Sequence, residues 1–412
     1  MDYVIVGAGP AGSVAADTLR AADPNSRITI IGEEDAPPYS RMAIPYYLVG
    51  NIEETGTYLK KEPGFYEKNN IELVRSRVSK ISPSEKNVTL ADGTKCSYDK
   101  LLIATGARPI KPPIDGLDLP GVHHCWTLED ARNIVERAQK GSKVVLMGAG
   151  FIGCIILEAL ALRGVELAVV EMGERMVPRM MNETAGGLLQ SWCEDKGVAV
   201  YCSTKITQVA DGDGELMVTL DTGKTIPADL VVVAAGVTPN IDFLEGSGIE
   251  TDQGILVDES LQTSAPDVYA AGDVAQGPNF FGGEKTVHAI QPTAADHARV
   301  AATNMTGGQS TYSGSLVMNV LDTLGLITAS YGEWEGVPGG ERAESLDENN
   351  YRYVNLQFDG DVLVGAITVG RTDMVGVLRG LIQSRVSLGP WKEALQQDPH
   401  RIAEAYVDRK GA

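Results

Sequence analysis

The chain has 412 residues, of which 43% are hydrophobic and 22% are charged, a composition typical of soluble globular proteins. This length predicts about two to four domains with ample hydrophobic core. The net charge of −20 argues against binding to nucleic acid or to an anionic membrane, because both surfaces are themselves negatively charged.

The sequence shows neither an export signal nor a membrane span. The few residues before Gly7 lack a basic region with an apolar core, and no uncharged apolar run reaches the roughly eighteen residues that a span requires. The cysteines are scattered and form no C-x-x-C pair, which favours a reducing compartment without a cysteine metal site. We therefore expect a cytoplasmic protein without a metal centre.

The chain opens with the pattern of a dinucleotide-binding turn. Residues 3–6 predict a buried strand and residues 13–22 an Ala-rich helix, joined by Gly7-Ala8-Gly9-Pro10-Ala11-Gly12. The three glycines permit a tight turn, a close approach to a pyrophosphate, and close packing of helix on strand. The helix N-terminus would direct unpaired N–H groups at that phosphate. On its own, such a turn is also common as a purely structural feature.

Two glutamates follow the second predicted strand, residues 27–31. A carboxylate at this place can accept hydrogen bonds from both hydroxyls of an adenosine ribose. Glu33 lies 26 residues after Gly7, and Glu34 is an equal alternative. The next loop carries Arg41, which could pair with a diphosphate or could be a solvated loop charge.

Short strands are predicted over residues 71–90, and a further strand over residues 98–104 leads into Thr105-Gly106-Ala107-Arg108-Pro109. The prolines and glycines of residues 112–121 then predict a linker between domains. A helix over residues 127–140 follows this linker.

The opening pattern then repeats. Residues 143–147 predict a strand, residues 154–162 a helix and residues 165–170 a second strand, with the turn Gly148-Ala149-Gly150-Phe151-Ile152-Gly153 between the first two. Glu171 ends this unit, 23 residues after Gly148. Two complete strand–turn–helix–strand–acid units predict two right-handed parallel βαβ nucleotide sites.

The second unit favours NADH over NADPH. The carboxylate of Glu171 would repel the 2′-phosphate of NADPH and accept the free ribose hydroxyls of NADH. Arg175 lies close enough in sequence to leave NADPH as an alternative.

The middle of the chain predicts mainly strands. Residues 198–229 alternate as a meander, and the apolar residues 230–235 end at Gly236. Strands are also expected over residues 257–263 and 268–270, the latter closed by Ala271-Gly272-Asp273. Residues 289–305 predict a helix with an apolar face.

The pattern changes from residue 311. Strands are expected over residues 315–331 and 351–368, separated by a charged, glycine-rich loop at residues 332–350. A helix at about residues 371–386 and a short terminal helix follow. Residues 311–412 therefore predict a separate α+β domain.

Five motifs in this order resemble the two-dinucleotide flavoproteins of the pyridine nucleotide–disulfide oxidoreductase family. The closest-looking branches use NADH and reduce ferredoxin, rubredoxin or nitrite-reductase centres. The motifs are Gly7 to Gly12, Leu102-Ile103-Ala104-Thr105-Gly106, Gly148 to Gly153 with Glu171, Ala235-Gly236-Val237-Thr238-Pro239-Asn240, and Thr263 to Asp273.

The resemblance implies an α/β fold with two Rossmann-like dinucleotide-binding domains, as in glutathione reductase, plus a C-terminal α+β interface domain. It places an FAD-binding domain at residues 1–115 and 242–310, an NAD(P)H-binding domain at residues 116–241, and the interface domain at residues 311–412. Because the family's third domain commonly forms a dimer interface, a homodimer is expected.

The resemblance also implies that FAD binds the first unit and NADH, or less favourably NADPH, the second. The helix that begins near Gln291 would direct its positive N-terminus at the flavin N1–C2=O edge and stabilise the reduced flavin. The implied cofactor-binding residues are Gly7, Gly9, Pro10, Ala11, Gly12, Glu33, Glu34, Arg41, Thr105, Gly106, Arg108, Gly148, Gly150, Phe151, Ile152, Gly153, Glu171, Gly236, Gly272, Asp273 and Gln291.

Three aromatic residues are the predicted catalytic residues. Phe151 stands where relatives have an aromatic residue between nicotinamide and flavin, and a simple packing role is the alternative. Tyr46 and Tyr47 could line the flavin or fill the core. His288 and His297 could supply a proton near the flavin, with a structural role as the alternative.

The departures from the family define the chemistry. Met42 occupies the position of the redox cysteine in the loop Tyr39 to Tyr47, so a thiol relay and disulfide reduction are not expected. Ile155 stands where relatives often have a glutamate, so the nicotinamide pocket is expected to be unusually apolar.

The sequence thus predicts an FAD-dependent NAD(P)H oxidoreductase. A hydride from NADH would pass to flavin N5, and electrons would leave to a non-disulfide acceptor, either a small iron–sulfur or rubredoxin-like protein or a partner subunit. One alternative is an NADH oxidase that uses O₂ directly. Another is a flavin-bearing redox-sensing or interaction protein.

Overall fold

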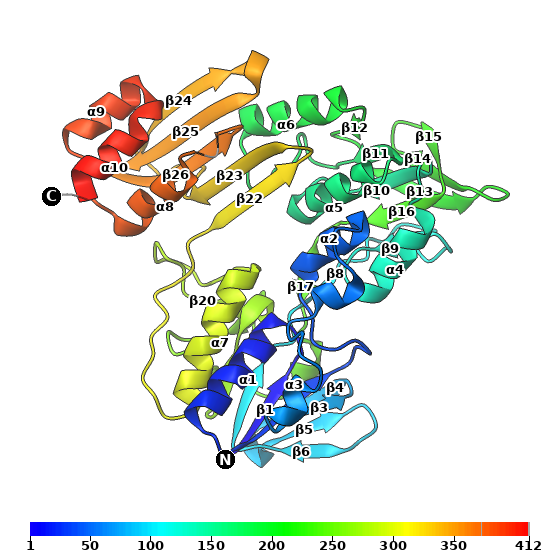
Figure 1. Ribbon diagram of the computed structural model, residues 1–412, viewed down its shortest axis with the longest axis vertical. Coiled ribbons are helices and arrows are strands. Elements are labelled where there is room, and N and C mark those ends of the chain that lie inside the picture. The colour runs from blue at the N-terminus through cyan, green and yellow to red at the C-terminus, as the bar shows by residue number, and fades with distance from the viewer. Residues whose placement is uncertain (372, 411–412) are drawn as a thin grey trace. The chain divides into compact units, whose positions relative to one another are not determined.

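The computed structural model describes residues 1–371 and 373–410 (Figure 1). Contacts divide these residues into two compact units, the first formed by residues 1–110 and 237–315 and the second by residues 111–236 and the chain from residue 316 onward. The second unit therefore holds both the expected NAD(P)H-binding region and the expected C-terminal domain. The boundaries of the three expected domains stay a prediction, and residues 372, 411 and 412 lie outside the described residues.

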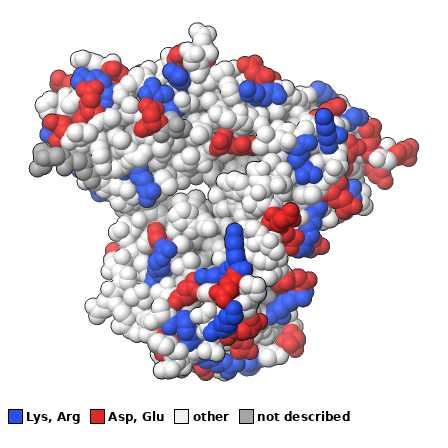
Figure 2. Space-filling view, viewed as in Figure 1, with Lys and Arg blue, Asp and Glu red and all other residues white. Residues whose placement is uncertain are grey.

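Acidic and basic side chains are interspersed over the face of the molecule shown in Figure 2. Ion pairs in the chain include Arg27 with Glu72 and Lys86 with Asp267. Exposed pairs of this kind contribute little to stability.

The core of the first unit is a parallel five-stranded sheet. Apolar runs that are buried on both faces suit such a sheet, which needs helices on its faces. Its strand order is β19-β7-β1-β2-β3. The bounds are β1 Asp2–Val6, β2 Arg27–Gly32, β3 Ile71–Arg75, β7 Lys100–Ile103 and β19 Val268–Ala270.

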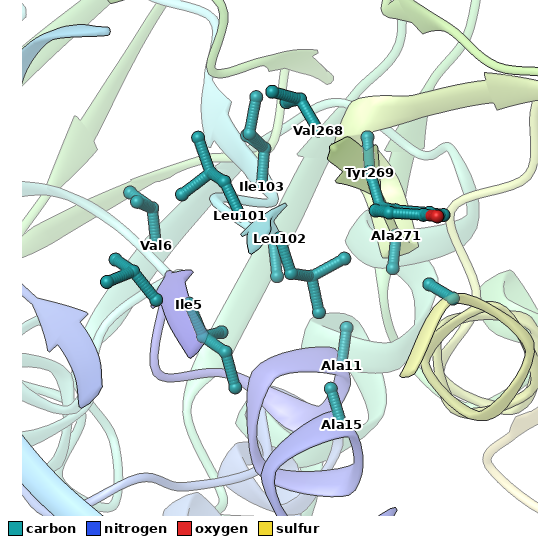
Figure 3. Close-up of a cluster of buried hydrophobic side chains, with 14 of the residues drawn as sticks. Ile5, Val6, Ala11, Ala15, Leu101, Leu102, Ile103, Val268, Tyr269 and Ala271 are labelled. Atoms are coloured by element: carbon teal, nitrogen blue, oxygen red, sulfur yellow. The ribbon is translucent and has the colours of Figure 1, made fainter. Parts of the chain in front are cut away.

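Two helices far apart in sequence lie side by side on this sheet, α1 Pro10–Ala22 and α7 Gln291–Met305 (Figure 1). Proline at the first position of α1 suits a helix start, because its missing N–H is not needed there. Ala11 and Ala15 of α1 face Ile5 and Leu102 of the sheet (Figure 3). The small alanines let the helix approach the strands closely.

Shorter elements surround this core. Two three-stranded sheets have the orders β4-β5-β6 and β18-β20-β21, and β8 pairs with β17. The strands are β4 Val78–Ser82, β5 Asn87–Leu90, β6 Lys95–Ser97, β8 Ala107–Pro109, β17 Val237–Pro239, β18 Ile255–Leu256, β20 Ala275–Gly277 and β21 Thr286–Val287. The short helices are η1 Arg41–Ala43, α2 Ile44–Val49, η2 Glu54–Thr57, α3 Phe65–Lys68, η3 Pro83–Glu85, η4 Asp242–Leu244 and η5 Gly272–Val274.

The second unit contains a second parallel sheet, in the order β12-β11-β10-β16-β9. Its strands are β9 Val122–His124, β10 Lys143–Met147, β11 Glu166–Val170, β12 Ala199–Tyr201 and β16 Leu230–Val233. Its helices are α4 Leu128–Arg137, α5 Phe151–Leu162 and α6 Glu183–Asp195. A separate antiparallel meander comprises β13 Ile206–Asp211, β14 Leu216–Leu220 and β15 Thr225–Ala228.

An antiparallel sheet and three helices complete this unit. The sheet has the order β22-β23-β26-β25-β24, and the helices gather at its side (Figure 1). The bounds are β22 Met318–Thr323, β23 Leu326–Gly332, β24 Glu341–Asp347, η6 Glu348–Asn350, β25 Arg352–Asp359, β26 Val362–Val369, α8 Val375–Ser384, α9 Pro390–Gln397, η7 Pro399–Arg401 and α10 Ile402–Lys410. The predicted α/β fold class with its C-terminal α+β region is confirmed.

Two of the predicted elements are wrong. Residues 332–350 are not only a loop, because they contain β24, an edge strand in which Ala343 alone is buried. Residues 257–263 form no regular strand, because the side chain of Asp258 accepts hydrogen bonds from the backbone N–H groups of Ser260 and Gln262 and turns the chain.

Candidate functional site

The first glycine turn leaves open space where a pyrophosphate would lie. Gly7 has a φ of +120°, and a Cβ atom there would collide with the carbonyl oxygen of Ala104. A Cβ atom at Gly12 would collide with the carbonyl oxygen of Gly7, whereas one at Gly9 would meet nothing within 4 Å. Gly7 and Gly12 are therefore required by the fold, and Gly9 keeps space free above the turn.

The second glycine turn repeats this geometry. Gly148 has a φ of +100°, and a Cβ atom there would lie 2.5 Å from the carbonyl oxygen of Ala234. A Cβ atom at Gly153 would collide with the carbonyl oxygen of Gly148, and one at Gly150 would again meet nothing within 4 Å. Both turns thus have the shape that a dinucleotide pyrophosphate needs.

Both turns lead into helices whose first N–H groups are not capped by side chains. Gly9 precedes α1 and Gly150 precedes α5, and neither helix has a side-chain N-cap hydrogen bond. The partial positive charge at such a terminus attracts a diphosphate. Phe151 and Ile152 are the first two residues of α5 and are partly buried, so the role of Phe151 beside nicotinamide stays a prediction.

Glu171 lies directly against the second turn. Its side chain is 9% exposed, and its two carboxylate oxygens accept hydrogen bonds from the N–H groups of Ala149 and Gly173, both at 2.6 Å. Arg175 is occupied elsewhere, because its guanidinium donates to the carbonyl oxygens of Met181 at 2.9 Å and Pro178 at 3.3 Å. A carboxylate without a competing arginine favours NADH at this turn.

The two glutamates after β2 have different contacts. Glu33 is exposed, and its carboxylate lies 3.9 Å from Arg77. Glu34 accepts hydrogen bonds from the hydroxyl of Tyr39 at 2.5 Å and from the guanidinium of Arg41 at 2.7 Å. Arg41 also donates to the hydroxyl of Tyr39 at 2.6 Å. Arg41 is therefore part of a hydrogen-bonded cluster rather than a solvated loop charge.

Asp273 and Gln291 lie near the same turn. Gly272 has a φ of +77°, and a Cβ atom there would lie 3.3 Å from the side chain of Ala11 and 3.4 Å from that of Ala294. Gly272 therefore lies between α1 and α7. At the next residue, Asp273, burial raises the pKa of the carboxyl group against the opposing effect of Arg41.

The loop after β2 is fixed to the start of α7. The side-chain oxygen of Gln291 accepts a hydrogen bond from the hydroxyl of Ser40 at 2.5 Å. The first glycine turn, Arg41, Asp273 and the N-terminus of α7 thus converge within one unit. Sequence reasoning missed Tyr39 and Ser40, because their partners lie on other elements.

Thr105 and Arg108 link two segments of the first unit that are far apart in the sequence. The Thr105 hydroxyl donates to the carbonyl oxygen of Asn240 at 3.0 Å, and the Asn240 amide donates to the carbonyl oxygen of Thr105 at 3.0 Å. Arg108 donates to the Asn240 side chain at 3.1 Å and pairs with Asp242 at 2.7 Å. These contacts are structural links, and cofactor contacts by Thr105, Gly106, Arg108 and Gly236 stay predictions.

The loop Tyr39 to Tyr47, where the family resemblance places the redox cysteine, is partly exposed. The side chain of Met42 is 52% exposed and that of Tyr46 is 58% exposed, so Tyr46 does not fill the core, whereas Tyr47 is partly buried. The side chain of Met42 is a thioether, which cannot form a thiolate. Burial raises the pKa values of the Cys125 and Cys193 thiols to about 12, which makes these cysteines poor nucleophiles.

The two histidines near α7 are shielded. His288 shares a hydrogen bond of 2.6 Å with the hydroxyl of Thr286, and burial lowers its pKa. His297 is 2% exposed and meets the ring of Tyr312 edge-on, with the ring centres 4.5 Å apart. Burial, together with the nearby His288, lowers the pKa of His297 to about 4, so it is neutral near pH 7. This favours a structural role over proton donation.

Metal and membrane features were also sought in residues 1–371 and 373–410. Within these ranges, no group of three or more His, Cys, Asp or Glu side chains is arranged to hold a metal ion. No helix in the described part of the chain combines the length and hydrophobicity needed to cross a membrane.

Comparison with known sequences identifies the family. The sequence model of the pyridine nucleotide-disulphide oxidoreductases matches residues 1–298. The chain belongs to this family. It is 32% identical over 411 residues to the epsilon subunit of the NADH-dependent phenylglyoxylate dehydrogenase of Aromatoleum evansii, with 99% of this chain and 97% of that one covered. It is 33% identical over 322 residues to an NADH oxidase of Methanocaldococcus jannaschii, with coverage of 76% and 71%.

A solved structure shows the same fold. A ferredoxin reductase of Rhodopseudomonas palustris matches with a TM-score of 0.86 and 27% identity, with 94% of this chain and 95% of that one covered. These findings confirm the predicted family, fold class and cofactors. The protein is an FAD- and NADH-dependent oxidoreductase.

Proposed function

We propose that this oxidoreductase exchanges electrons between NADH and an iron–sulfur centre on a partner protein or partner subunit. The observation that carries the proposal is the pair of complete nucleotide turns combined with Met42 in the loop where a thiolate would be needed for disulfide chemistry. When bound, FAD would provide the chemistry of accepting a hydride from NADH and releasing electrons one at a time.

The residues present suit positioning more than acid–base chemistry. The turns at Gly9 and Gly150 would hold the two diphosphates, and Glu171 would hold the ribose of NADH. Asp273 and the N-terminus of α7 would lie beside the flavin. Catalysis would then depend on orientation of the nicotinamide and on the fixed dipole of α7.

A partner subunit is our first choice of acceptor. The relative from Aromatoleum evansii is itself a subunit, and the match covers nearly the whole of both chains. The ferredoxin reductase fold supports an iron–sulfur protein as the redox partner. The mixed charges on the visible face offer no broad basic patch for a strongly acidic carrier (Figure 2), which favours a shape-matched subunit over a purely electrostatic complex.

The proposal is tested with purified protein under anaerobic conditions. We expect flavin absorbance that NADH bleaches within the mixing time and NADPH bleaches slowly. Reoxidation is then followed with a plant-type ferredoxin, a rubredoxin and an aromatic disulfide as alternative acceptors. Electron transfer to an iron–sulfur acceptor but not to the disulfide supports the proposal. Flavin that NADH does not reduce, or equally fast reduction of the disulfide, overturns it.

A direct reaction with O₂ is the second candidate, favoured by the similarity to an NADH oxidase. Without a thiolate at Met42, the expected product is hydrogen peroxide, with NADH oxidised to NAD⁺ as O₂ takes up two electrons and two protons. Rapid consumption of NADH in air without a partner, with one peroxide formed per NADH, would favour this candidate. We expect this rate to be far below that with the true acceptor.

We also propose that the protein is a cytoplasmic homodimer. The five free cysteines suit a reducing compartment. The homodimer is proposed because the third domain of this family commonly forms a dimer interface. Light scattering coupled to gel filtration measures the mass of the protein directly. A monomer at micromolar concentration would contradict the proposed homodimer.

A further inference from the structure

The loop between β11 and α6 contains a strained residue. Val177 has a φ of +46°, and its side chain is 1% exposed. A β-branched residue rarely adopts this left-handed conformation, because its Cβ substituents crowd the backbone. Such a conformation persists only where the surrounding structure holds it.

Val177 is bound to the middle residue of the second glycine turn. Its N–H donates to the carbonyl oxygen of Ala149 at 2.8 Å. The N–H of Ala149 donates to the carboxylate of Glu171 at 2.6 Å. Both backbone polar groups of Ala149 are thus fixed by the segment that follows β11.

Fixing the carbonyl of Ala149 also fixes the N–H of Gly150. The Ala149 carbonyl and the Gly150 N–H belong to one planar trans peptide, so they point in opposite directions. While Val177 holds the carbonyl, the N–H of Gly150 in the same peptide stays directed away from Val177. Release of the carbonyl by Val177 would leave it with the weaker hydrogen bond from the Cys154 thiol, at 3.4 Å.

Arg175 closes the loop around Val177. Its guanidinium donates to the carbonyl oxygens of Met181 and Pro178, and the N–H groups of Met180 and Met181 donate to the carbonyl oxygen of Val177 at 3.0 and 3.1 Å. α6 packs against the outside of the loop.

The packing of α6 requires a glycine. A Cβ atom at Gly186 would lie 2.8 Å from the carbonyl oxygen of Met176 and 2.9 Å from the side chain of Arg175. The loop is therefore held from inside by Arg175 and from outside by α6.

We propose that residues 173–181, the clamp loop, orient the second glycine turn for NADH, with Arg175 and Val177 as positioning residues that do not touch the nucleotide. The clamp loop keeps the turn in its binding shape before the nucleotide arrives, so less ordering is needed on binding. The inference rests on NADH binding at this turn and is independent of the identity of the electron acceptor.

The first test compares two arginines of the same loop. Arg175→Met removes the hydrogen bonds that close the clamp loop, and Arg179→Met, at an exposed position four residues later, is the matched control. In the FAD-loaded protein, we expect Arg175→Met to weaken NAD⁺ binding, measured by calorimetry, about tenfold. In Arg175→Met, the KM for NADH should rise by a similar factor, whereas kcat should stay within about twofold of the wild-type value. Arg179→Met should match the wild type in both.

Rescue by a conservative variant separates positioning from general stability. Arg175→Lys keeps one donor near the two carbonyl oxygens, so its affinity for NAD⁺ should lie between those of Arg175→Met and the wild type. If Arg175→Met lowers the melting temperature but leaves the Kd for NAD⁺ unchanged, the proposal is overturned. Equal losses in Arg175→Met and Arg179→Met also overturn it.

A second variant tests the backbone of Val177. Val177→Gly keeps the N–H and adopts a positive φ without strain, so we expect a Kd for NAD⁺ within about twofold of the wild type. A tenfold loss of affinity in a folded Val177→Gly protein would show that the side chain, not the backbone position, is what binding needs. That result contradicts the proposed role of Val177.

Discussion

The two glycine turns of this chain share their backbone geometry and differ in the residue that follows the neighbouring strand. The N–H of Gly7 donates to Ile31, and that of Gly148 to Val170, both at 2.8 Å. After Val170 comes Glu171, whose carboxylate reaches the turn directly. After Ile31 comes Gly32, where a Cβ atom would lie only 2.8 Å from the side chain of Ala8.

This difference shows how one motif is supported in two ways. At the second turn, Glu171 contacts the turn itself, and the clamp loop contacts both Glu171 and the turn. At the first turn a glycine packs against the turn, and the acids come one and two residues later. Glu34 is then held by Tyr39 and Arg41 from the following loop. The same nucleotide-binding turn therefore depends on different parts of the chain in each unit.

The largest expected effects separate binding from folding at the two turns. Gly9→Ala should abolish FAD binding and Gly150→Ala should weaken NADH binding about 100-fold, because each Cβ would occupy the space meant for a diphosphate. Neither should cost more than about 1 kcal/mol of folding free energy. Calorimetry with NAD⁺ and the flavin absorbance of the purified proteins measure the two effects.

Gly153→Ala is the control for these variants, because its Cβ would collide with the turn. We expect a loss of at least about 3 kcal/mol in the free energy of unfolding, or failure to fold. Loss of FAD in Gly150→Ala, or of NAD⁺ binding in Gly9→Ala, would contradict the independence of the two turns.

The next effect contrasts the pH responses of the two units. In the first unit, the pKa of His297 falls from 6.5 to about 4 on burial, so the unfolded state binds the extra proton. Stability should therefore fall by up to about 3 kcal/mol as the pH drops from 6.5 to 4. His297→Phe should remove this loss of stability, measured as the free energy of unfolding at a series of pH values. An unchanged pH profile in the variant refutes the assignment.

Glu158 on α5 gives the second unit the opposite response. Burial, with the charge of Asp322, raises the pKa of its carboxyl group from 4.5 to about 7. Stability from this group should therefore fall as the pH rises through this range, because the folded state holds the proton longer. Glu158→Gln should flatten the profile of the second unit, followed by the melting temperature at a series of pH values.

A smaller effect tests the acid of the second turn. Glu171→Gln should weaken NADH binding about tenfold, through loss of a charged acceptor, and narrow the preference for NADH over NADPH. Steady-state KM values for both nucleotides measure this change. The content of FAD should stay as in the wild type, and retention of the full NADH preference would mean that another residue excludes NADPH.

The smallest effect compares the two acids of the first unit. Glu34→Gln should reduce FAD affinity severalfold, because it weakens the cluster with Tyr39 and Arg41, whereas Glu33→Gln should leave it unchanged. The partly exposed ion pair with Arg41 itself is worth no more than about 1 kcal/mol. Fluorescence titration of apoprotein with FAD distinguishes them, and the reverse ranking would assign the ribose contact to Glu33.

Sequence alone determined the two turns, because their requirements are local. A Cβ atom at Gly12 would collide with Gly7 inside the same turn, although the clash at Gly7 is with Ala104, far along the chain. Apolar runs such as residues 230–233 report burial in a parallel sheet. The repeat at Gly148 could be read in the same way, whereas Met42 was recognised through the family's cysteine position. Such rules predicted two nucleotide sites in parallel βαβ units, whereas the assignment of FAD to the first site came from the resemblance to the family.

Tertiary structure decided what depends on partners distant in sequence. β24 escaped notice because an edge strand with one buried residue needs no apolar pattern. The contacts of Glu34 with Tyr39 and Arg41, the occupation of Arg175 by backbone carbonyls and the link of Ser40 to Gln291 each require a neighbour that only folding supplies. The strained backbone of Val177 has no sequence signal at all, because its conformation is imposed by the turn and the loop around it.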